Sequence, residues 1–558
     1  MKHTKRLLFL SLFTLCLLGQ STAQIAANPK IDAIFSEWDS TDVPGCSLGV
    51  FQNGILIYGR GYGMANLEYD IPNSTQSVFR IGSTAKQFTA ACIVLLAEAG
   101  KLKLQDPIRK YFPNLPAVDD DIKIQHLLNH TSGLRDYLVL SYLKGLRDDD
   151  FYTDGEVMQW LEAQESLNFE PGSQYLYCNS GFWLLGQLVE KVSGQNMADF
   201  AKAQIFDPLE MFNTHFHNDH TQIVKNRASG YVPKNGGGYR ISMTTLDMIG
   251  DGGIFTTIED VKKWDDAYYY RDVLSDYFWN TMTTKGILNN GEEIRYANGL
   301  NVGTYKGLKT IRHGGAFVGF RAELLRFPEQ HTTIAVFANR GDANPSAKAD
   351  QVAEVLLGSL MEKNKMEGAD QQESEMPLEL ISLTAEQIKP FEGNYEFSPG
   401  YFAEVTLQRD TLFFLQKWDE GRYPIFPVSE NTFVLGLSDP IRFVFSDLEG
   451  GEAQTLSFVQ NGNTSPAKRT DGIVKTIKVD DFIGKYYSKE ADVVYELYVV
   501  EDQLKLKIKG AERFSLVNSG EDKLSGGGMT FNFERENGTI SGYKLDLGRV
   551  KNFHFKKQ

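Results

Sequence analysis

Short, mostly apolar runs with polar turns between them lie near both ends of the first 361 residues of the chain. Near the start, Ser47 to Phe51 and Ile55 to Tyr58 flank a Gln-Asn-Gly turn and predict a hairpin. Val318 to Phe327 and Thr332 to Phe337 predict a second antiparallel pair. The sequence between the two pairs is mostly helical in pattern. We therefore expect one antiparallel sheet assembled from distant parts of the chain and covered by helices, an α/β (α+β) domain.

Helical patterns flank this expected sheet. Ala33 to Trp38 predicts a short helix before the first strand, and Ala347 to Met361 predicts a longer one after the last. The composition then shifts to Glu, Lys, Gln and Asp with few apolar residues, which is typical of a linker. The expected boundaries are a first domain at 24–361 and a linker at 362–380.

A weak internal repeat follows the linker. Phe391-Glu-Gly-Asn-Tyr395 recurs as Phe482-Ile-Gly-Lys-Tyr486, and Arg442 to Phe445 parallels Thr530 to Phe533. The spacing of about 90 residues exceeds the periods of 20–50 found in solenoids. Each copy also contains alternating strand-like segments. We therefore expect two small antiparallel β-domains at 381–473 and 474–558, each a lipocalin-like barrel; the alternative is two unrelated β segments.

Composition and charge narrow the class of protein. The chain has 558 residues, of which 42% are hydrophobic and 23% charged, which excludes disorder or coiled coil as the main architecture. The formal net charge is −15, with 57 Lys and Arg against 72 Asp and Glu. Because this charge repels polyanions, nucleic acid is not an expected partner.

The first 23 residues have the pattern of an export signal. Basic residues precede the apolar run Leu7 to Leu18, and Ser21-Thr22-Ala23 supplies small residues before a cleavage point near Ala23. The run is too short to span a bilayer, so no stable membrane insertion is expected. The expected location is periplasmic or secreted. A lipoprotein would need small residues before Cys16, where Thr14 and Leu15 stand.

Three cysteines would remain after cleavage: Cys46, Cys92 and Cys178. An odd number in an exported chain of this size argues against a disulfide framework. We expect Cys46 and Cys92 to be buried apolar residues.

The sequence contains three Ser-x-x-Lys tetrads, beginning at Ser83, Ser141 and Ser465. About two are expected from composition alone, so the tetrad is informative only in context. Ser83 follows Ile-Gly and opens a long helical run. At the first turn of a helix its hydroxyl would lie at the positive end of the dipole, with Lys86 on the same face. A partly desolvated Lys86 can accept the serine proton; the alternative is a serine N-cap beside a solvated lysine.

Further sequence blocks stand in the order found in the penicillin-recognising serine hydrolases. They are Phe79-Arg-Ile-Gly-Ser-Thr-Ala-Lys86, His126-Leu-Leu-Asn-His-Thr-Ser-Gly-Leu134, Pro171-Gly172 to Asn179, Gly252-Gly-Ile-Phe-Thr-Thr257 and His313-Gly-Gly315. The chain resembles the branch that includes class C-type β-lactamases, D-Ala-D-Ala carboxypeptidases, D-aminopeptidases and esterases, over roughly residues 28–361. The resemblance implies a β-lactamase/transpeptidase-like fold with a helical subdomain.

The resemblance also implies roles for single residues. Ser83 corresponds to the nucleophile, Lys86 to the residue that deprotonates it and Tyr177 to a second proton-shuttling group. Asn179 corresponds to an amide that holds the acyl side of the substrate, and the backbone N–H groups of Ser83 and Ala316 to the oxyanion hole. His313, Gly314 and Gly315 form the substrate-binding strand. The implied substrate is a small molecule or short peptide, and no metal or cofactor is required. The oligomeric state is left open.

The third element departs from many relatives. Where β-lactamases and carboxypeptidases often have Lys-Thr-Gly, this chain has His313-Gly314-Gly315. A histidine with its ordinary pKa near 6.5 is mostly neutral at pH 7 and holds a substrate carboxylate less well than lysine. This favours an esterase or D-aminopeptidase over an efficient β-lactamase. Two β-domains after the first domain also resemble the D-aminopeptidase arrangement.

Two other classes of function remain as alternatives. His215, His217 and His220, with Asp219 between them, have the His-x-His-x-Asp-His spacing of zinc-dependent hydrolases. A non-catalytic binding or sensing protein on the same fold would be expected to lack one catalytic side chain, and Ser83, Lys86 and Tyr177 are all present. The sequence does not choose among peptide, ester and β-lactam substrates. It also leaves open the role of the C-terminal domains and whether Cys178 tunes activity.

Overall fold

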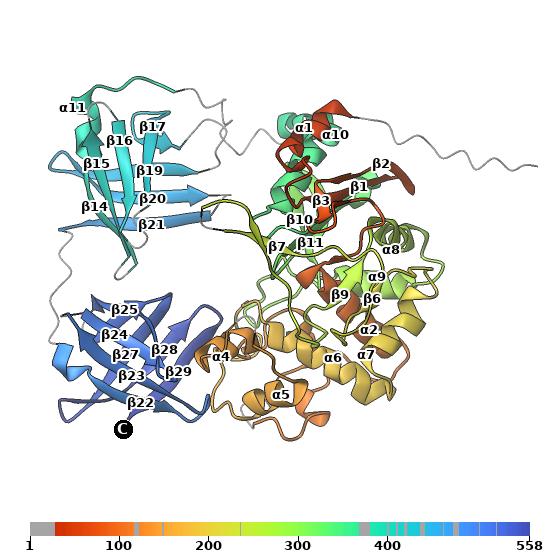
Figure 1. The fold of residues 1–558 in the computed structure, drawn as a ribbon, viewed down its shortest axis with the longest axis horizontal. Helices are drawn as coiled ribbons and strands as arrows, with labels where there is room; N and C mark the ends of the chain where they lie inside the picture. The colour runs from red at the N-terminus through yellow and green to blue at the C-terminus, as the bar shows by residue number, and fades with distance from the viewer. Residues whose placement is uncertain are drawn as a thin grey trace, which may run out of the picture.

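The computed structural model describes the chain from residue 28 to its end, apart from short gaps. The described ranges are 28–116, 122–147, 150–234, 236–367, 380–398, 401–408, 411–417, 421–435, 441–460, 463–471, 479–501, 503–520 and 522–558. The expected export signal at 1–23 lies outside them. Figure 1 shows an N-terminal domain of mixed helices and strands beside two small β-domains, one above the other.

A six-stranded antiparallel sheet organises the N-terminal domain. Its order is β10-β11-β12-β13-β1-β2. The N-terminal strand β1 pairs with β13, for example Cys46 with Ala338. Strands from distant parts of the chain therefore form one sheet, as expected. The strands are β1 (Cys46–Gln52), β2 (Ile55–Tyr62), β10 (Asn301–Tyr305), β11 (Leu308–Phe317), β12 (Phe320–Phe327) and β13 (Thr332–Ala338).

Both faces of the sheet are covered. Leu48 and Val50 of β1 pack with apolar residues of α1 (Pro29–Ile34) and α10 (Pro345–Glu367) on one side. Phe51 belongs to the larger core on the other side. That side carries the remaining helices, α2 (Lys86–Glu98), α3 (Ile124–Leu128), α4 (Tyr137–Leu143), α5 (Asp154–Glu162), α6 (Asn179–Ser193), α7 (Met197–Ala201), α8 (Ile258–Tyr270) and α9 (Asp276–Thr283).

Shorter strands complete this domain. β5 (Phe79–Arg80), β9 (Ile254–Thr256) and β6 (His215–Phe216) form a three-stranded sheet in the order β5-β9-β6. Two further pairs are β3 (Met64–Asn66) with β4 (Ile71–Pro72), and β7 (Tyr231–Pro233) with β8 (Tyr239–Ile241). The three-stranded sheet leads directly into the segment that carries Ser83.

Two helices differ from their expected bounds. The first begins at Pro29 because the Asn28 side chain caps the N–H groups of Lys30 and Ile31, and its α-helical part ends at Ile34 before a 3-10 turn at Ser36–Trp38. The helix expected to end at Met361 continues to Glu367, into the segment expected to be a linker. No helix within the described ranges is both long and apolar enough to cross a membrane.

The expected C-terminal β-domains are two closed eight-stranded antiparallel barrels. The first barrel consists of β14 (Gly393–Ser398), β15 (Tyr401–Gln408), β16 (Thr411–Gln416), β17 (Arg422–Pro427), β18 (Thr432–Val434), β19 (Arg442–Glu449), β20 (Glu452–Gln460) and β21 (Asn463–Thr470), preceded by α11 (Ala385–Ile388). The second consists of β22 (Gly484–Ser488), β23 (Val493–Val500), β24 (Gln503–Ile508), β25 (Ala511–Gly520), β26 (Lys523–Gly526), β27 (Met529–Glu536), β28 (Thr539–Leu547) and β29 (Val550–Lys557).

The two barrels relate differently to the N-terminal domain. The core of the first barrel is a separate apolar cluster, whereas the core of the second is continuous with the large core of the N-terminal domain. In Figure 1 the second barrel lies beside α4 and α5. The Tyr495 hydroxyl of β23 donates a hydrogen bond to Leu143 O of α4 across 2.8 Å. The second barrel is therefore docked on the helical part of the N-terminal domain.

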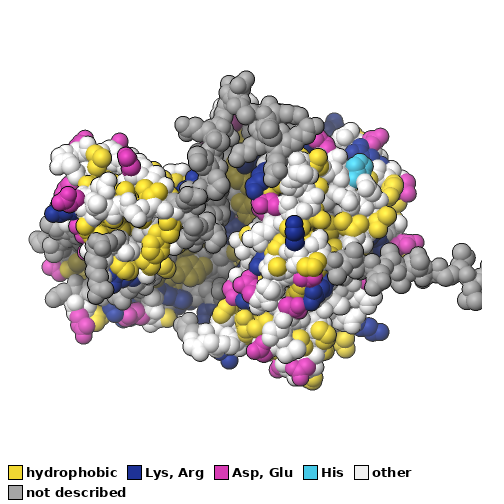
Figure 2. Space-filling model, turned by 90° about the horizontal axis from the view of Figure 1, so that it is seen from above, with side chains coloured by type: hydrophobic (Ala, Val, Ile, Leu, Met, Phe, Trp, Pro, Cys, Tyr) yellow, Lys and Arg dark blue, Asp and Glu magenta, His cyan; other side chains and the backbone are white. Residues whose placement is uncertain are grey.

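Acidic and basic side chains are interspersed on the face drawn in Figure 2. The first barrel and the N-terminal domain form separate lobes in that view. The net charge of −15 is therefore not gathered into one acidic patch on this face.

Candidate active site

Ser83 lies in a 3-10 turn, Gly82–Ala85, between β5 and α2. Two glycines allow this turn to approach β11. A Cβ on Gly82, whose φ is +52°, would lie 2.8 Å from Ala316 N, and a Cβ on Gly315 would lie 1.9 Å from Ile81 O. Side chains at these positions would force the two segments apart. The glycines thus bring the backbones of Ser83 and Ala316 together at one edge of the sheet.

Lys86 is fully buried beneath Ser83 and contacts three oxygen atoms. Its Nζ lies 3.2 Å from Ser83 Oγ, 2.9 Å from Asn179 Oδ1 and 2.5 Å from Asp251 O. Two of these atoms belong to carbonyl groups and can only accept a hydrogen bond. A neutral amine has two N–H donors and one lone pair. A neutral Lys86 therefore donates to Asn179 and Asp251 and has its lone pair free to accept the Ser83 proton.

The surroundings of Lys86 favour this neutral form. Burial lowers the pKa of Lys86 from 10.5 to about 8, against the opposing effect of the Asp251 and Asp136 carboxylates, while the Arg549 cation lowers it further. At pH 7 to 8 a useful fraction of Lys86 is unprotonated. A base with a pKa near the working pH suits general base catalysis.

Tyr177 approaches the same serine from the loop before α6. Its hydroxyl is buried and makes no hydrogen bond within the described ranges, and it faces the Ser83 hydroxyl outside ordinary hydrogen-bond geometry. Burial raises the pKa of Tyr177, and the Ser83 hydroxyl opposes this effect. Lys86 Nζ lies 4.9 Å from the centroid of the Tyr177 ring. The expected triad of Ser83, Lys86 and Tyr177 is therefore assembled in one place.

Asn179 is the first residue of α6. Its N–H donates to Asp136 Oδ2 across 2.7 Å. Its Oδ1 is 2.9 Å from Lys86 Nζ, so Asn179 orients the base as well as lining the cavity.

His313 lies on β11 and has partners on both ring nitrogens. Nδ1 donates to Gly314 O across 2.6 Å, and Nε2 accepts from the Tyr296 hydroxyl across 2.8 Å. Burial and the Lys86 cation lower the pKa of His313 to about 4. The ring is thus neutral at pH 7, in accord with the loss of a permanent cation at this position.

These side chains surround one cavity of about 630 Å³. Ser83, Tyr177, Asn179 and the segment His313–Ala316 line it, and so does Arg549 from the second barrel. The residues expected to form the site therefore share a single cavity, with Lys86 directly beneath it. This arrangement can hold a carbonyl group against Ser83.

The alternative histidine cluster does not come together. His215 and His217 face each other at 3.3 Å, but His220 Nδ1 pairs with Asp247 Oδ2 at 2.8 Å. Burial lowers the pKa of His217 to about 4. Across the ranges that the structure describes, no group of three or more His, Cys, Asp and Glu side chains is placed to hold a metal ion.

The three cysteines within the described ranges are buried as free thiols. Cys46 and Cys92 lie in apolar cores, as expected. Cys178 Sγ donates to Leu134 O across 3.3 Å, and its N–H donates to His130 Nδ1 across 3.1 Å. Cys178 therefore helps to fix the loop between Tyr177 and Asn179.

Four residues of the site were not found from the sequence. Asp136 and Asp251 lie next to motif blocks that are visible in the sequence, so their position along the chain could have marked them as site residues. Tyr296 is a lone tyrosine with no motif around it. Arg549 lies in the second barrel, far from the other blocks in sequence, and only the docking of that barrel brings it to the cavity.

Comparison with known proteins supports the fold and the family of the chain. Residues 31–358 match the family model described as Beta-lactamase. Penicillin-binding protein 4* of Bacillus subtilis (strain 168) is 28% identical over 445 residues, which cover 75% of this chain and 93% of that protein. The D-aminopeptidase of Brucella anthropi is 28% identical over 321 residues, 56% of this chain. The match spans only 59% of the length of that D-aminopeptidase.

Solved structures share the fold. The octameric penicillin-binding protein homologue from Pyrococcus abyssi matches with a TM-score of 0.55 and 23% identity, over 88% of this chain and 98% of its own. The D-amino acid amidase from Ochrobactrum anthropi SV3 matches with a TM-score of 0.51 and 22% identity, over 60% of this chain and 100% of its own.

Proposed function

Because the chain belongs to the β-lactamase family of serine hydrolases, we propose that it hydrolyses small amides or esters through an acyl-enzyme on Ser83. Peptides that contain D-amino acids are the favoured substrates, followed by simple esters and β-lactams. The observation that carries the proposal is the buried Lys86, whose two N–H donors have carbonyl partners while its lone pair faces Ser83 Oγ.

The reaction follows from the positions of the side chains. The neutral Lys86 amine takes the Ser83 proton as Oγ bonds to the substrate carbonyl carbon. In this proposal the backbone N–H groups of Ser83 and Ala316 stabilise the oxyanion. When the carbon–nitrogen or carbon–oxygen bond of the substrate breaks, Tyr177 delivers a proton to the leaving group and is reprotonated from Lys86. Water then attacks the acyl carbon while the neutral Lys86 amine takes a proton from it. The bond between the acyl carbon and Ser83 Oγ breaks, Lys86 returns the proton to Oγ, and the carboxylic acid product leaves.

The choice of substrate class rests on two observations. The neutral His313, with both ring nitrogens engaged, supplies no cation on β11 for a substrate carboxylate. D-aminopeptidases are among the relatives, at 26–28% identity. Both favour a D-aminopeptidase or esterase over an efficient β-lactamase.

A substrate panel tests the proposal. Wild-type protein and Ser83→Ala are assayed in parallel on p-nitrophenyl acetate, D-alanine p-nitroanilide and a chromogenic cephalosporin. The proposal is supported if the wild type turns over at least one substrate and Ser83→Ala lowers that rate by about 10³-fold or more. A loss on the order of 10³-fold is what removal of a nucleophile causes. Equal rates for the two proteins on every substrate would refute it.

We also propose that the protein is exported, with cleavage near Ala23. N-terminal sequencing of protein recovered from the periplasm or medium of an expressing bacterium tests this. A mature chain that begins near Gln24 supports export, and an intact N-terminus in the cytoplasm contradicts it.

A further inference from the structure

The last hairpin of the second barrel reaches the catalytic cavity. β28 and β29 are joined by Gly548 and Arg549, and Arg549 lines the cavity that contains Ser83. Its Nη1 lies 3.2 Å from Asp136 Oδ2, and its guanidinium carbon lies 5.7 Å from the centroid of the Tyr177 ring. A cation from a separate domain thus stands next to the catalytic phenol.

This hairpin is held firmly in place. Asn168 Nδ2 donates to Arg549 O across 2.9 Å, and Asn168 Oδ1 accepts from Lys551 N across 2.7 Å. Arg135 Nη2 donates to Lys551 O and Asn552 O, each across 3.2 Å. The backbone from Arg549 to Asn552 is therefore tied to the N-terminal domain. A group fixed in advance loses little freedom when it binds a ligand.

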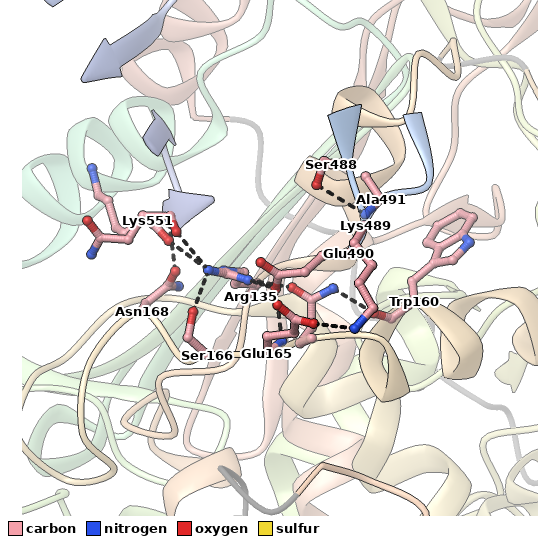
Figure 3. Close-up of polar contacts among 12 residues, drawn as sticks. Arg135, Trp160, Glu165, Ser166, Asn168, Ser488, Lys489, Glu490, Ala491 and Lys551 are labelled. Atoms are coloured by element: carbon pink, nitrogen blue, oxygen red, sulfur yellow. Dashed lines mark hydrogen bonds and ion pairs between the residues drawn. The ribbon is translucent and has the colours of Figure 1, made fainter. Parts of the chain in front are cut away.

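Arg135 is itself fixed by a buried ion pair with Glu490 of the second barrel, as Figure 3 shows. The two side chains are 0% and 4% exposed. Glu490 Oε2 also accepts from Glu165 N across 3.0 Å. These contacts connect the barrel, the loop around Asn168 and the hairpin into one network.

The Arg549 guanidinium has N–H groups that can donate to a ligand. Its side chain is 32% exposed, and within the described ranges it forms an ion pair with Asp136 but no side-chain hydrogen bond. Arg549 also lines a second cavity of about 430 Å³, whose walls include Leu138, Val139 and Leu547. The guanidinium therefore stands between two cavities, with N–H groups open to a bound molecule.

The other two cations that line the catalytic cavity are less suited to this task. Arg321 Nη1 already donates to Val318 O and Phe320 O. Arg80 is only 6% exposed and lies against the Phe317 ring, with its guanidinium carbon 5.0 Å from the centroid. Of the three arginines that line the cavity, Arg549 is the one whose guanidinium lies over the Tyr177 ring, and β11 itself carries a neutral His313.

From these contacts we infer that Arg549 of the second barrel binds a carboxylate of the substrate and so makes this barrel part of the specificity site. The inference rests on the proposed function, since it names a substrate group for the same cavity. A guanidinium binds a carboxylate through paired charge-assisted hydrogen bonds, so a substrate with a free carboxylate is preferred over the matching amide.

Binding to a protein without the nucleophile tests the inference separately from catalysis. In the Ser83→Ala background, D-alanyl-D-alanine and D-alanyl-D-alanine amide are titrated by calorimetry. We expect the carboxylate form to bind about 10- to 100-fold more tightly, in line with one charge-assisted contact. Arg549→Gln, which can still donate to Asp136, should abolish that preference, and Arg549→Ala should do the same.

The matched control is Arg535→Ala, since Arg535 forms ion pairs with Asp481 and Asp522 within the same barrel. This variant should keep the preference. No preference in the parent, or a preference that survives Arg549→Gln, would overturn the inference. An equal loss for both ligands would also overturn it, because it would assign Arg549 to positioning through Asp136. If wild-type and Ser83→Ala proteins turn over substrates equally, the proposed function fails whatever the titrations show.

Discussion

Tyr296 and His313 form a hydrogen bond that fixes the protonation of the histidine. The Tyr296 hydroxyl donates to Nε2 across 2.8 Å, and Nδ1 of the same ring donates to the backbone carbonyl of Gly314. Because one nitrogen accepts and the other donates, the ring is held as a neutral tautomer. Burial keeps His313 from titrating near neutral pH, and Tyr296 supplies the partner that its buried Nε2 needs in the neutral form.

Replacing Tyr296 by Phe removes this donor and leaves Nε2 buried without a partner. An unsatisfied buried acceptor costs about 1–3 kcal/mol, so we expect the free energy of unfolding to fall by that amount. The measurement is urea unfolding at pH 7. The matched control is Tyr270→Phe, an exposed tyrosine on α8, which should be neutral. Equal stability of Tyr296→Phe and wild type would contradict the assigned hydrogen bond.

The pH dependence of kcat/KM should report the titration of Lys86. Lys86 accepts a proton only when neutral, and its pKa is about 8, so kcat/KM should rise with pH up to about 8 and then level off. Tyr177 stays protonated over this range because burial raises its pKa above 10. His313, with a pKa of about 4, contributes no step near pH 6.5. A single acid limb centred near 6.5 would assign the base to a histidine and contradict this account.

Arg549 should influence that same pH profile. The Arg549 cation lowers the pKa of Lys86, so its removal raises that pKa and moves the acid limb of kcat/KM to higher pH. We expect Arg549→Gln to show this shift on p-nitrophenyl acetate, a substrate without a carboxylate. Arg535→Ala should show none. A limb that stays in place would mean that solvent screens Arg549 from Lys86.

Tyr177→Phe separates catalysis from stability. The Tyr177 hydroxyl is buried and without a hydrogen bond in the described ranges, so its removal should leave Tm unchanged or slightly higher. If the hydroxyl carries the leaving-group proton, kcat should fall about 10²- to 10⁴-fold. Tyr175→Phe, at a more exposed neighbour, is the control. An active Tyr177→Phe variant would remove this residue from the proton path.

The docking of the second barrel depends on Glu490. Glu490→Gln leaves Arg135 buried without its counter-charge, which we expect to cost about 3–5 kcal/mol of stability. Lys489→Gln, at the adjacent but exposed pair with Glu165, should leave stability essentially unchanged because solvent screens that pair. Thermal and urea unfolding of both variants checks this. Similar losses for the two variants would show that burial of the Arg135 pair does not stabilise the interface.

Local patterns in the sequence predicted much of the fold and of the site. The hairpin strands follow from short apolar runs on either side of a turn, and both barrels follow from alternating segments and the repeat of Phe391 and Phe482. The strand that carries His313 was expected from the family resemblance. The meeting of Ser83 with Lys86 follows from their spacing at the start of a helix. Tyr177 and Asn179 were placed by their motif.

What the sequence did not predict depends on long-range packing. Arg549 reaches the cavity because a whole barrel docks through the Arg135–Glu490 pair, and no local pattern encodes that contact. Tyr296 acts through one hydrogen bond to a distant strand. The end of α10 was placed too early because Glu362 to Glu367 is polar, yet the helix continues to Glu367.

Trapping the covalent intermediate is the most direct test of the central claim. Wild-type protein is mixed with excess p-nitrophenyl acetate, quenched in acid within the first turnovers, and examined by mass spectrometry before and after digestion. We predict a mass increase of one acetyl group, confined to the peptide that contains Ser83, and none in Ser83→Ala. Turnover with no acylated protein, or an acetyl group on another residue while Ser83→Ala keeps full activity, would contradict the account.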